Sequence, residues 1–401
     1  MKKAIGILLC ALLLFALASP AFAGERADGL HFRADGTFKI LHLTDTQDDH
    51  HPAADMLALV KEAIETEQPD LIVFTGDLVE DWRVADGTTD DDPLHEGVCV
   101  YKDLTRNELD LTATRANVEA ASDAVLSVLQ ASGIPFAITQ GNNDYKVGYT
   151  NEDWLQLYSR YSNNLTFDES DDELGRIDYH LEIKGSSGAT VFNLWLMDTG
   201  RGGIDQQSID WYQSAASALT EENGSTPIPA MAFQHIYAPD IGNLFLPCSP
   251  LDDGARCTDG KFYRLDPERA SGTPLFAYAP CEPSAEFQAW KAQGDVVAAW
   301  FGHQHTEGFS GNVDGIELGF TYGCEYAKPG PYGYRVITLN EADPARYNTA
   351  LVGYTDGLRG SLLQFMLDAS PVFPRVTPAL KMLSALRNFM LSMVSAVISL
   401  F

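Results

Sequence analysis

The sequence predicts an α/β protein: a four-layer α/β/β/α sandwich with two mixed sheets between outer helices. Apolar runs alternate with helical stripes in the early part of the chain, and strand follows strand in the later part. This order of elements is typical of two packed sheets covered by helices. Polar residues also follow most of the expected strands, at the position where ligands of α/β folds usually gather.

The early elements alternate between strand and helix. Residues 38–43 form an apolar strand, and a helical stripe at 56–64 follows it and ends before a proline. The next elements are a strand at 71–74, a polar and acidic surface insertion at 80–111, a helix at 118–129 and a strand at 135–139. The later strands are expected at 191–197, 230–234, 296–301, 316–321 and 334–339.

Residues 1–23 have the features of a secretory signal peptide. Lys2 and Lys3 supply the positive start, residues 5–17 are mostly apolar, and residues 21–23 fit a small-x-small cleavage site. We therefore expect a secreted or cell-surface protein. A short N-terminal membrane anchor is the alternative, although the apolar stretch is short for a span.

The main domain is expected at 24–345, with a C-terminal extension at 346–401. Its last segment, residues 379–401, is apolar, and its only charged residues are Lys381 and Arg387. Two interpretations remain open for this helix. It packs on the domain, or it associates with a membrane surface as an interfacial helix or anchor.

The charge balance excludes some classes of partner. The formal net charge is −29, which repels nucleic-acid backbones and disfavours binding to anionic membranes. We therefore expect no nucleic acid binding. A phosphate site in such a chain must rely on local positive charge, such as that of a metal ion.

Cleavage of the signal segment would leave five of the six cysteines in the mature chain. An exported protein meets an oxidising environment, so one or two disulfides are expected. Cys248 and Cys257 enclose a short polar loop and are the first choice for a pair. Buried free thiols are the alternative.

Five polar motifs occur directly after apolar runs. Asp, Asn and His form a mixed oxygen and nitrogen ligand set that suits Mn, Fe or Zn. Five such motifs at successive strand ends indicate a site for two divalent or trivalent metal ions, which together can clamp both oxygens of a phosphoryl transfer. The motifs contain Asp45 and Gln47, then Asp77, then Asn142, Asn143 and Asp144, then His235, and finally His303 and His305.

The order of these motifs resembles the signature of the calcineurin-like metallophosphoesterase superfamily. That signature is Asp-x-His, Gly-Asp, Gly-Asn-His-Asp/Glu, His and Gly-His-x-His. The resemblance covers roughly residues 38–340 and is closest to the single-domain purple acid phosphatase-like branch. It rests on Leu-Met-Asp-Thr-Gly at 196–200, Trp-Tyr-Gln at 211–213, Phe-Gln-His-Ile at 233–236 and the run from Gly294 to His303.

The resemblance implies a role for each ligand. A water or hydroxide bound between the metals, with a lowered pKa, would be the nucleophile. A bridging carboxylate offsets two cations, and neutral imidazoles hold the geometry. Asp45, Gln47 and His305 would bind the first metal, Asp77 would bridge both metals, and Asn142, His235 and His303 would bind the second.

Two positions depart from the family pattern. Gln47 stands where the family has a histidine, and its amide oxygen is a weaker ligand for a softer metal. Asn143 stands where the family has the histidine beside the phosphate. An amide donates a hydrogen bond but delivers no proton at neutral pH, and the loss of general acid catalysis typically costs about 10²–10⁴-fold in rate.

The leading hypothesis is therefore a secreted, metal-dependent phosphoesterase that hydrolyses a small phosphate monoester or diester. Asp77 and Asn143 are its expected catalytic residues. The alternative is a catalytically impaired member that binds a phosphorylated ligand or acts as a surface-attached binding protein. Gln47 and Asn143 favour this alternative.

Overall fold

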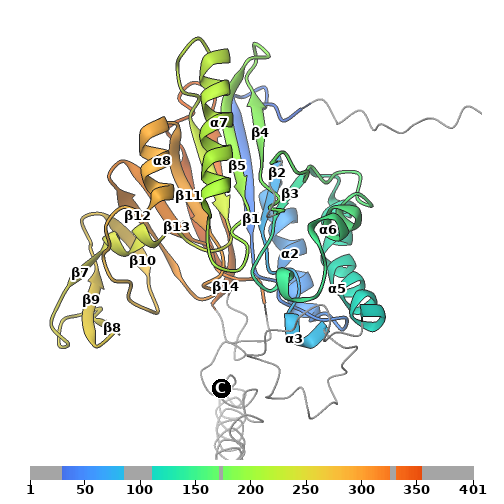
Figure 1. The fold of residues 1–401 in the computed structure, drawn as a ribbon, viewed down its shortest axis with the longest axis horizontal. Helices are drawn as coiled ribbons and strands as arrows, with labels where there is room; N and C mark the ends of the chain where they lie inside the picture. Colours follow the sequence, from blue (N-terminus) through green and yellow to red (C-terminus); the bar gives the residue numbers. More distant parts are fainter. Residues whose placement is uncertain (1–28, 85–110, 171–174, 326–330, 355–401) are drawn as a thin grey trace, which may run out of the picture.

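The computed structural model of the chain describes residues 29–84, 111–170, 175–325 and 331–354. Two large β-sheets occupy the middle of the molecule, and helices cover their outer faces (Figure 1). This is the arrangement that the alternation of apolar runs and helical stripes predicts. The expected fold class, a four-layer sandwich with two mixed sheets, is confirmed.

The first sheet has five strands in the order β15-β14-β1-β2-β3. The three N-terminal strands run parallel, and the two C-terminal strands add antiparallel pairs at one side. All residues of β2 are buried, as expected for a strand covered on both faces. The strands are β1 (Thr37–Leu43), β2 (Leu71–Thr75), β3 (Phe136–Thr139), β14 (Tyr332–Asn340) and β15 (Asn348–Tyr354).

The second sheet has seven strands in the order β10-β12-β13-β11-β6-β5-β4. Its four central strands, from β13 to β5, run parallel to one another, while the outer strands pair in antiparallel fashion. The strands are β4 (Tyr179–Lys184), β5 (Thr190–Met197), β6 (Ala230–Gln234), β10 (Ala270–Thr273), β11 (Val296–Phe301), β12 (Gly308–Val313) and β13 (Ile316–Phe320).

Helices α2 (Ala54–Glu67) and α5 (Leu111–Ser132) lie on the side of the first sheet, and α7 (Gln206–Glu222) and α8 (Ala285–Gln293) cover the second (Figure 1). The hydroxyl of Ser284 caps α8 by accepting from the Phe287 backbone N–H, and Gly294 ends the helix in the left-handed conformation. The shorter helices are α3 (Asp81–Val84), α6 (Asn151–Tyr158), η3 (Asp144–Lys146) and η4 (Pro239–Leu244).

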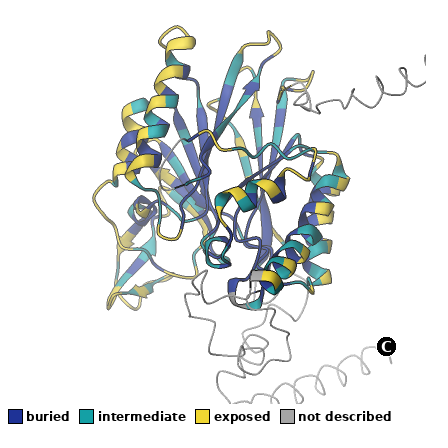
Figure 2. Cartoon of the chain, turned by 45° about the vertical axis from the view of Figure 1, so that its right-hand side comes forward, coloured by how far each residue is buried: buried dark blue, intermediate teal, exposed yellow. Residues whose placement is uncertain are grey.

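The central strands of both sheets are largely buried (Figure 2, dark blue), and their apolar residues form one cluster that joins the two sheets. Phe74 of the first sheet and Phe233 of the second belong to the same buried cluster. His42 of β1 is buried there as well, between the hydroxyls of Thr75 and Thr321, each 2.8 Å from a ring nitrogen. Burial lowers the pKa of His42 to about 3, so this ring is a neutral structural group.

A small third sheet, β7-β9-β8, shows why the expected disulfide is wrong. Cys248 follows β7 (Phe245–Pro247) and Cys257 lies in β8 (Arg256–Thr258), and both cysteines are free thiols. β9 (Lys261–Leu265) runs between them, because Phe262 accepts a hydrogen bond from Cys248 N and is paired with Cys257. Two strand spacings, about 9–10 Å in total, exceed the Cα separation that a disulfide tolerates.

Several expectations concern residues outside the described ranges, namely the signal segment 1–23, most of the insertion at 80–111, and the helix at 379–401. The expected domain boundary at 345 falls between two paired strands, because β15 continues the first sheet to Tyr354.

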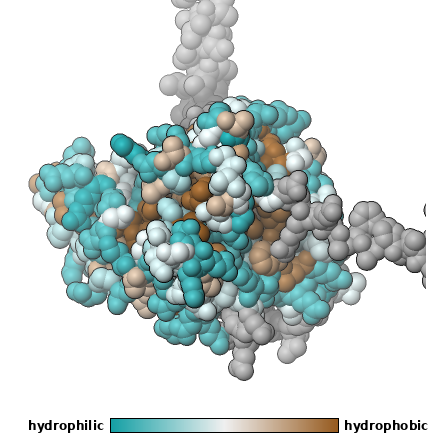
Figure 3. Space-filling view, turned by 90° about the horizontal axis from the view of Figure 1, so that it is seen from above, coloured by the Kyte–Doolittle hydropathy of each residue, from teal (hydrophilic) through white to brown (hydrophobic). Residues whose placement is uncertain are grey.

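Within the described ranges, no helix is both long and apolar enough to cross a membrane. Figure 3 shows a largely hydrophilic surface at the upper end of the molecule, with smaller apolar areas.

Candidate metal centre

The candidate ligands stand on loops that directly follow parallel strands. Parallel strands end at the same edge of a sheet, so these loops gather at one place. The loops of the two sheets also meet. His235 follows β6 of the second sheet, and its Nδ1 atom lies 2.8 Å from the carbonyl oxygen of Thr75, the last residue of β2 in the first sheet. Asp45 and Gln47 follow β1, Asp77 follows β2, Asn142 and Asn143 follow β3, His235 follows β6, and His303 and His305 follow β11.

The backbone of these loops is strained. Asp45, Gln47, Asp77 and His303 have φ values of 52°, 34°, 54° and 68°, in the left-handed region that non-glycine residues rarely adopt. They make up half of the eight non-glycine residues with positive φ in the described ranges. Each such residue costs on the order of 1–3 kcal/mol, and such strain concentrates at functional sites.

Gly76 and Gly141 allow the loops after β2 and β3 to touch. A Cβ atom on Gly141 would lie 2.1 Å from the backbone nitrogen of Asp77, and one on Gly76 would lie 2.2 Å from the backbone nitrogen of Gly141. The buried Asp144 carboxylate fastens the same contact, because it accepts from Asp77 N and Gly141 N, both at 2.9 Å. The backbone at Asp77 is therefore fixed by its neighbours.

The Nε2 atom of His235 lies close to two oxygen acceptors and to a ring nitrogen of His303. In the neutral ring, Nδ1 carries the proton that Thr75 O accepts, so Nε2 presents its lone pair. This Nε2 lies 3.1 Å from Asn142 Oδ1, 3.3 Å from Asp77 Oδ2 and 3.3 Å from His303 Nδ1. Lone pairs at such distances repel unless a proton or a cation lies among them. Atoms that bind one metal at about 2.1 Å are also about 3 Å apart.

In the metal-free protein a proton serves this purpose. Burial opposes the charged form of His235, but the carboxylates of Asp77 and Asp45 outweigh burial and raise its pKa to about 9. Burial and the neighbouring His235 lower the pKa of His303 to about 4. Burial also opposes ionisation of Asp77, yet His235 and the backbone N–H of Asn143 hold its pKa below the usual range. The cluster therefore attracts positive charge.

Asp45 and His305 form the other side of the centre. His305 Nε2 lies 3.3 Å from Asp45 Oδ1, while Asp45 Oδ2 accepts from the backbone N–H of His303 at 3.0 Å. The second ring nitrogen of His305, Nδ1, donates to the buried carboxylate of Glu325. Burial opposes the charged form of His305, but Glu325 and Asp45 raise its pKa to about 10. A carboxylate behind a histidine is a common way to orient a metal ligand.

The two residues that depart from the family pattern both contact Asp77. Gln47 Nε2 donates to Asp77 Oδ2 at 2.6 Å, and Asn143 Nδ2 donates to the same oxygen at 2.8 Å. The backbone N–H of Asn143 donates to Asp77 Oδ1 at 2.8 Å. Gln47 therefore lies at the site and turns its amide nitrogen toward Asp77. Its role as a metal ligand stays a prediction.

The donor set fits the metals that the motifs imply. Asp45, Asp77 and His235 are fully buried, and each offers a ligand atom within 4.8 Å of the others. Asp77, Asn142, His235 and His303 would hold one cation. Asp45, Asp77 and His305 would hold the other. This donor set mixes carboxylate, amide and imidazole, which suits Mn, Fe or Zn and leaves the choice among them open.

Glu325 is the site residue that the motif analysis missed. It lies five residues after the end of β13, a parallel strand of the same sheet as β6 and β11. The other candidate ligands are polar residues that follow parallel strands. The same criterion, applied to the residues after β13, would have included Glu325. A second group of potential ligands, Asp49, His50 and His51, lies past β1, where Asp48 and Asp49 form ion pairs with Arg83.

Comparisons with known proteins identify the family. The family model for calcineurin-like phosphoesterases matches residues 38–307, about two thirds of the chain, and the chain belongs to this family. Among curated proteins, the chain is 25% identical to the protein named Probable inactive purple acid phosphatase 14 of Arabidopsis thaliana, over 78% of this chain and 77% of that protein. It is 24% identical to Probable inactive purple acid phosphatase 29 of the same plant, over 80% and 82%.

Solved structures also resemble the chain. A dimetal phosphatase from Danio rerio matches with 14% identity and a TM-score of 0.41, over 79% of this chain and 99% of that chain. A 5′-nucleotidase from Candida albicans matches with 12% identity and a TM-score of 0.36, over 86% of this chain and 58% of that chain.

Proposed function

We propose that this chain is a metal-dependent phosphoesterase that hydrolyses a small phosphate monoester or diester. The observation that carries the proposal is the set of potential ligand atoms from Asp77, Asn142 and His303 around His235 Nε2, at 3.1–3.3 Å. In the metal-free protein the proton on His235 offsets the repulsion between the oxygen atoms and Nε2. A bound cation would take the place of that proton, and such a donor set is typical of metal-assisted hydrolysis.

Each residue has a definite part in such a reaction. Two cations, when bound, supply a water of lowered pKa and offset the charge of the phosphate oxygens. Asp77 offers a carboxylate oxygen within 4.8 Å of ligand atoms of both Asp45 and His235, so it would be the residue that the two cations share. The carbonyl oxygen of Thr75 fixes the ring of His235, and Glu325 fixes the ring of His305, so both imidazoles keep one orientation.

The leaving group receives little help from Asn143. Its backbone and side-chain N–H groups both donate to Asp77, and its Oδ1 accepts from Lys146 Nζ at 2.9 Å. An amide has no proton to deliver at neutral pH, and general acid catalysis is typically worth about 10²–10⁴-fold. We therefore expect the protein to act on esters whose alcohol leaves readily as an anion.

The direct test is an activity panel with Mn²⁺, Fe²⁺ or Zn²⁺. Purified protein should hydrolyse p-nitrophenyl phosphate or its bis ester with at least one of these metals. The Asp77→Ala variant is the background control. If the wild type is no faster than this variant with every metal, the hydrolase proposal is wrong.

The Asn143→His variant tests the explanation for leaving-group preference. A histidine restores a proton donor at this position, so hydrolysis of an alkyl phosphate should rise by on the order of 10–100-fold. Hydrolysis of p-nitrophenyl phosphate should change far less, because its leaving group needs no proton. Equal changes for both substrates would contradict the assigned role of Asn143.

A second candidate function is binding of a phosphorylated ligand without hydrolysis. The amide at Asn143 favours it, and the two Arabidopsis relatives bear names that call them inactive. Calorimetry with inorganic phosphate and metal-loaded protein separates the two functions. Metal-dependent phosphate binding without turnover supports the binding protein, and turnover supports the enzyme.

We also propose that the protein is exported, with residues 1–23 removed. The support is the charged start, the apolar stretch and the small residues before position 24 in the sequence. The mass of the protein isolated from its native source tests this. A chain that begins at or near residue 24 is expected, and a chain that retains residues 1–23 would contradict it.

A further inference from the structure

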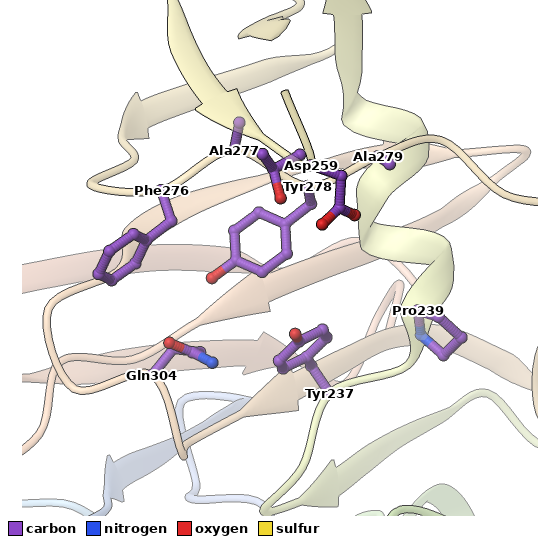
Figure 4. Close-up of a pocket in the computed structure, with 9 residues that line it drawn as sticks. Tyr237, Pro239, Asp259, Phe276, Ala277, Tyr278, Ala279 and Gln304 are labelled. Atoms are coloured by element: carbon purple, nitrogen blue, oxygen red, sulfur yellow. The ribbon is translucent and has the colours of Figure 1, made fainter. Parts of the chain in front are cut away.

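A cavity of about 490 Å³ has Tyr237 and Gln304, from the two loops that carry the candidate histidine ligands, in its lining (Figure 4). Its lining residues come from separate parts of the chain. Tyr237 follows β6, Asp259 lies in the turn between β8 and β9, Phe276 and Tyr278 lie between β10 and α8, and Gln304 lies in the loop after β11. The volume is in the range of pockets that hold a small organic group.

The cavity adjoins the metal centre through two of its walls. Gln304 stands between the two candidate ligands His303 and His305 in the sequence. Tyr237 lies two residues after His235, and its ring centroid is 6.4 Å from that of His303. A phosphate held at the centre would therefore have the cavity beside it, within reach of the group that the phosphate carries.

The walls of the cavity are aromatic. Tyr237 and Tyr278 meet edge to face with ring centroids 5.3 Å apart, and Phe276 stands on the rim with 53% of its surface exposed (Figure 4). None of the described lining residues is cationic, and Asp259 adds a carboxylate. Aromatic faces favour flat apolar groups, such as an aryl ring, over small or strongly hydrated groups.

The wall around Phe276 is held in place by a buried carboxylate. Glu307 is fully buried and accepts from the backbone N–H groups of Leu275 and Phe276, at 2.9–3.2 Å. Tyr278 packs against Phe309 and Phe320, with ring centroids 5.9 Å and 5.7 Å away. A wall fixed before binding loses little entropy when a ligand enters.

We propose that this cavity binds the alcohol part of the substrate and that the substrate is an aryl phosphate ester. The proposal rests on the phosphoesterase function proposed above and names its substrate class. Two independent observations agree. The aromatic walls favour a flat ring, and Asn143 supplies no proton, so the centre favours an alcohol such as a phenol that leaves as an anion.

The test compares two non-hydrolysable ligands, phenylphosphonate and methylphosphonate, by calorimetry on the full protein loaded with Mn²⁺. Phenylphosphonate should bind about tenfold more tightly. Phe276→Ala should reduce this preference by about threefold to tenfold, because one ring contact is lost. It should leave the affinity for methylphosphonate unchanged. Phe276 is half exposed, so the truncation leaves the core intact.

Leu251→Ala is the matched control. Leu251 is 95% exposed, precedes the strand β8 whose turn carries Asp259, and does not line the cavity. This variant should keep the full preference for phenylphosphonate. A loss of preference equal to that of Phe276→Ala would contradict a role of the cavity.

The remaining outcomes separate the two proposals. If both phosphonates bind equally well to the wild type, the cavity proposal is overturned and the phosphate site stands. If neither phosphonate binds to metal-loaded protein, the phosphate site itself is overturned, and the cavity proposal with it.

Discussion

The two sides of the candidate metal centre differ in the number of ligand atoms that the chain supplies. On one side, donor atoms of Asp77, Asn142 and His303 all lie within 3.3 Å of a fourth donor atom, His235 Nε2. On the other side, Asp45 and His305 have their ligand atoms 3.3 Å apart, and Gln47 occupies the place of an expected histidine. From this difference we expect one firmly held cation and one held more weakly.

The largest effect is expected from Asp77→Ala, which removes the residue common to both sides. Both cations lose an anionic ligand, so metal content should fall to well below one ion per chain. Any hydrolysis should fall by on the order of 10³-fold or more. Elemental analysis of the purified variant measures the first effect. If the variant retains two ions per chain, Asp77 does not bridge the two cations.

Gly141→Ala should disturb the complete side through the backbone. The added Cβ would lie 2.1 Å from Asp77 N and 2.2 Å from Asp77 Oδ1, so the loops after β2 and β3 must separate. We expect unfolding free energy to fall by about 1–3 kcal/mol or more. Chemical denaturation measures this, with Gly202→Ala as the control because a Cβ there meets nothing within 4 Å. Equal stability of the two variants would contradict the described contact.

Glu325→Gln should affect the weaker side alone. The Glu325 carboxylate holds Nδ1 of His305, and loss of such a partner typically costs about 10–100-fold in metal affinity. The weaker of two metal-binding steps should shift by this amount, and the tighter step should stay within about twofold. If the tighter step shifts instead, His305 belongs to the tighter metal site, and the assignment of the two sides is reversed.

Metal affinity should also depend on pH in a defined direction. In the metal-free protein the pKa values of His235 and His305 are raised to about 9 and about 10, so both rings hold a proton that a cation must displace. Affinity should therefore rise with pH between 6 and 9, by up to about tenfold per pH unit for each proton released. His303 adds no such cost, because its pKa is lowered to about 4. Calorimetry in buffers of different ionisation enthalpy counts the protons, and an affinity independent of pH would contradict the raised values.

The sequence predicted the features that depend on local pattern. Apolar runs marked β1, β2, β3, β5, β6, β11, β13 and β14, and the polar residues after the parallel strands marked most of the residues that the structure brings together. The short strands β7 and β8 escaped detection because each has only three residues and only one of these six residues, Phe245, is buried. Glu325 escaped because it follows its strand by five residues and matches no motif.

Other features depend on pairing across distant parts of the chain. The disulfide expectation failed because the sequence does not show that β9 runs between Cys248 and Cys257. The aromatic cavity was not foreseen for the same reason, since Tyr237, Asp259, Tyr278 and Gln304 meet only through the register of separate strands and loops. Gln47 was assigned by its place in a motif, and its contact with Asp77 follows from the strained backbone after β1.

The most direct test of an unequal two-metal centre is a calorimetric titration of the metal-free wild-type protein with Mn²⁺. The described contacts predict two ions per chain, bound in two steps whose affinities differ by about tenfold or more. The tighter step should disappear in His303→Ala, which removes one of the four donors on the complete side. Less than one ion per chain, or two steps of equal affinity, would contradict the account.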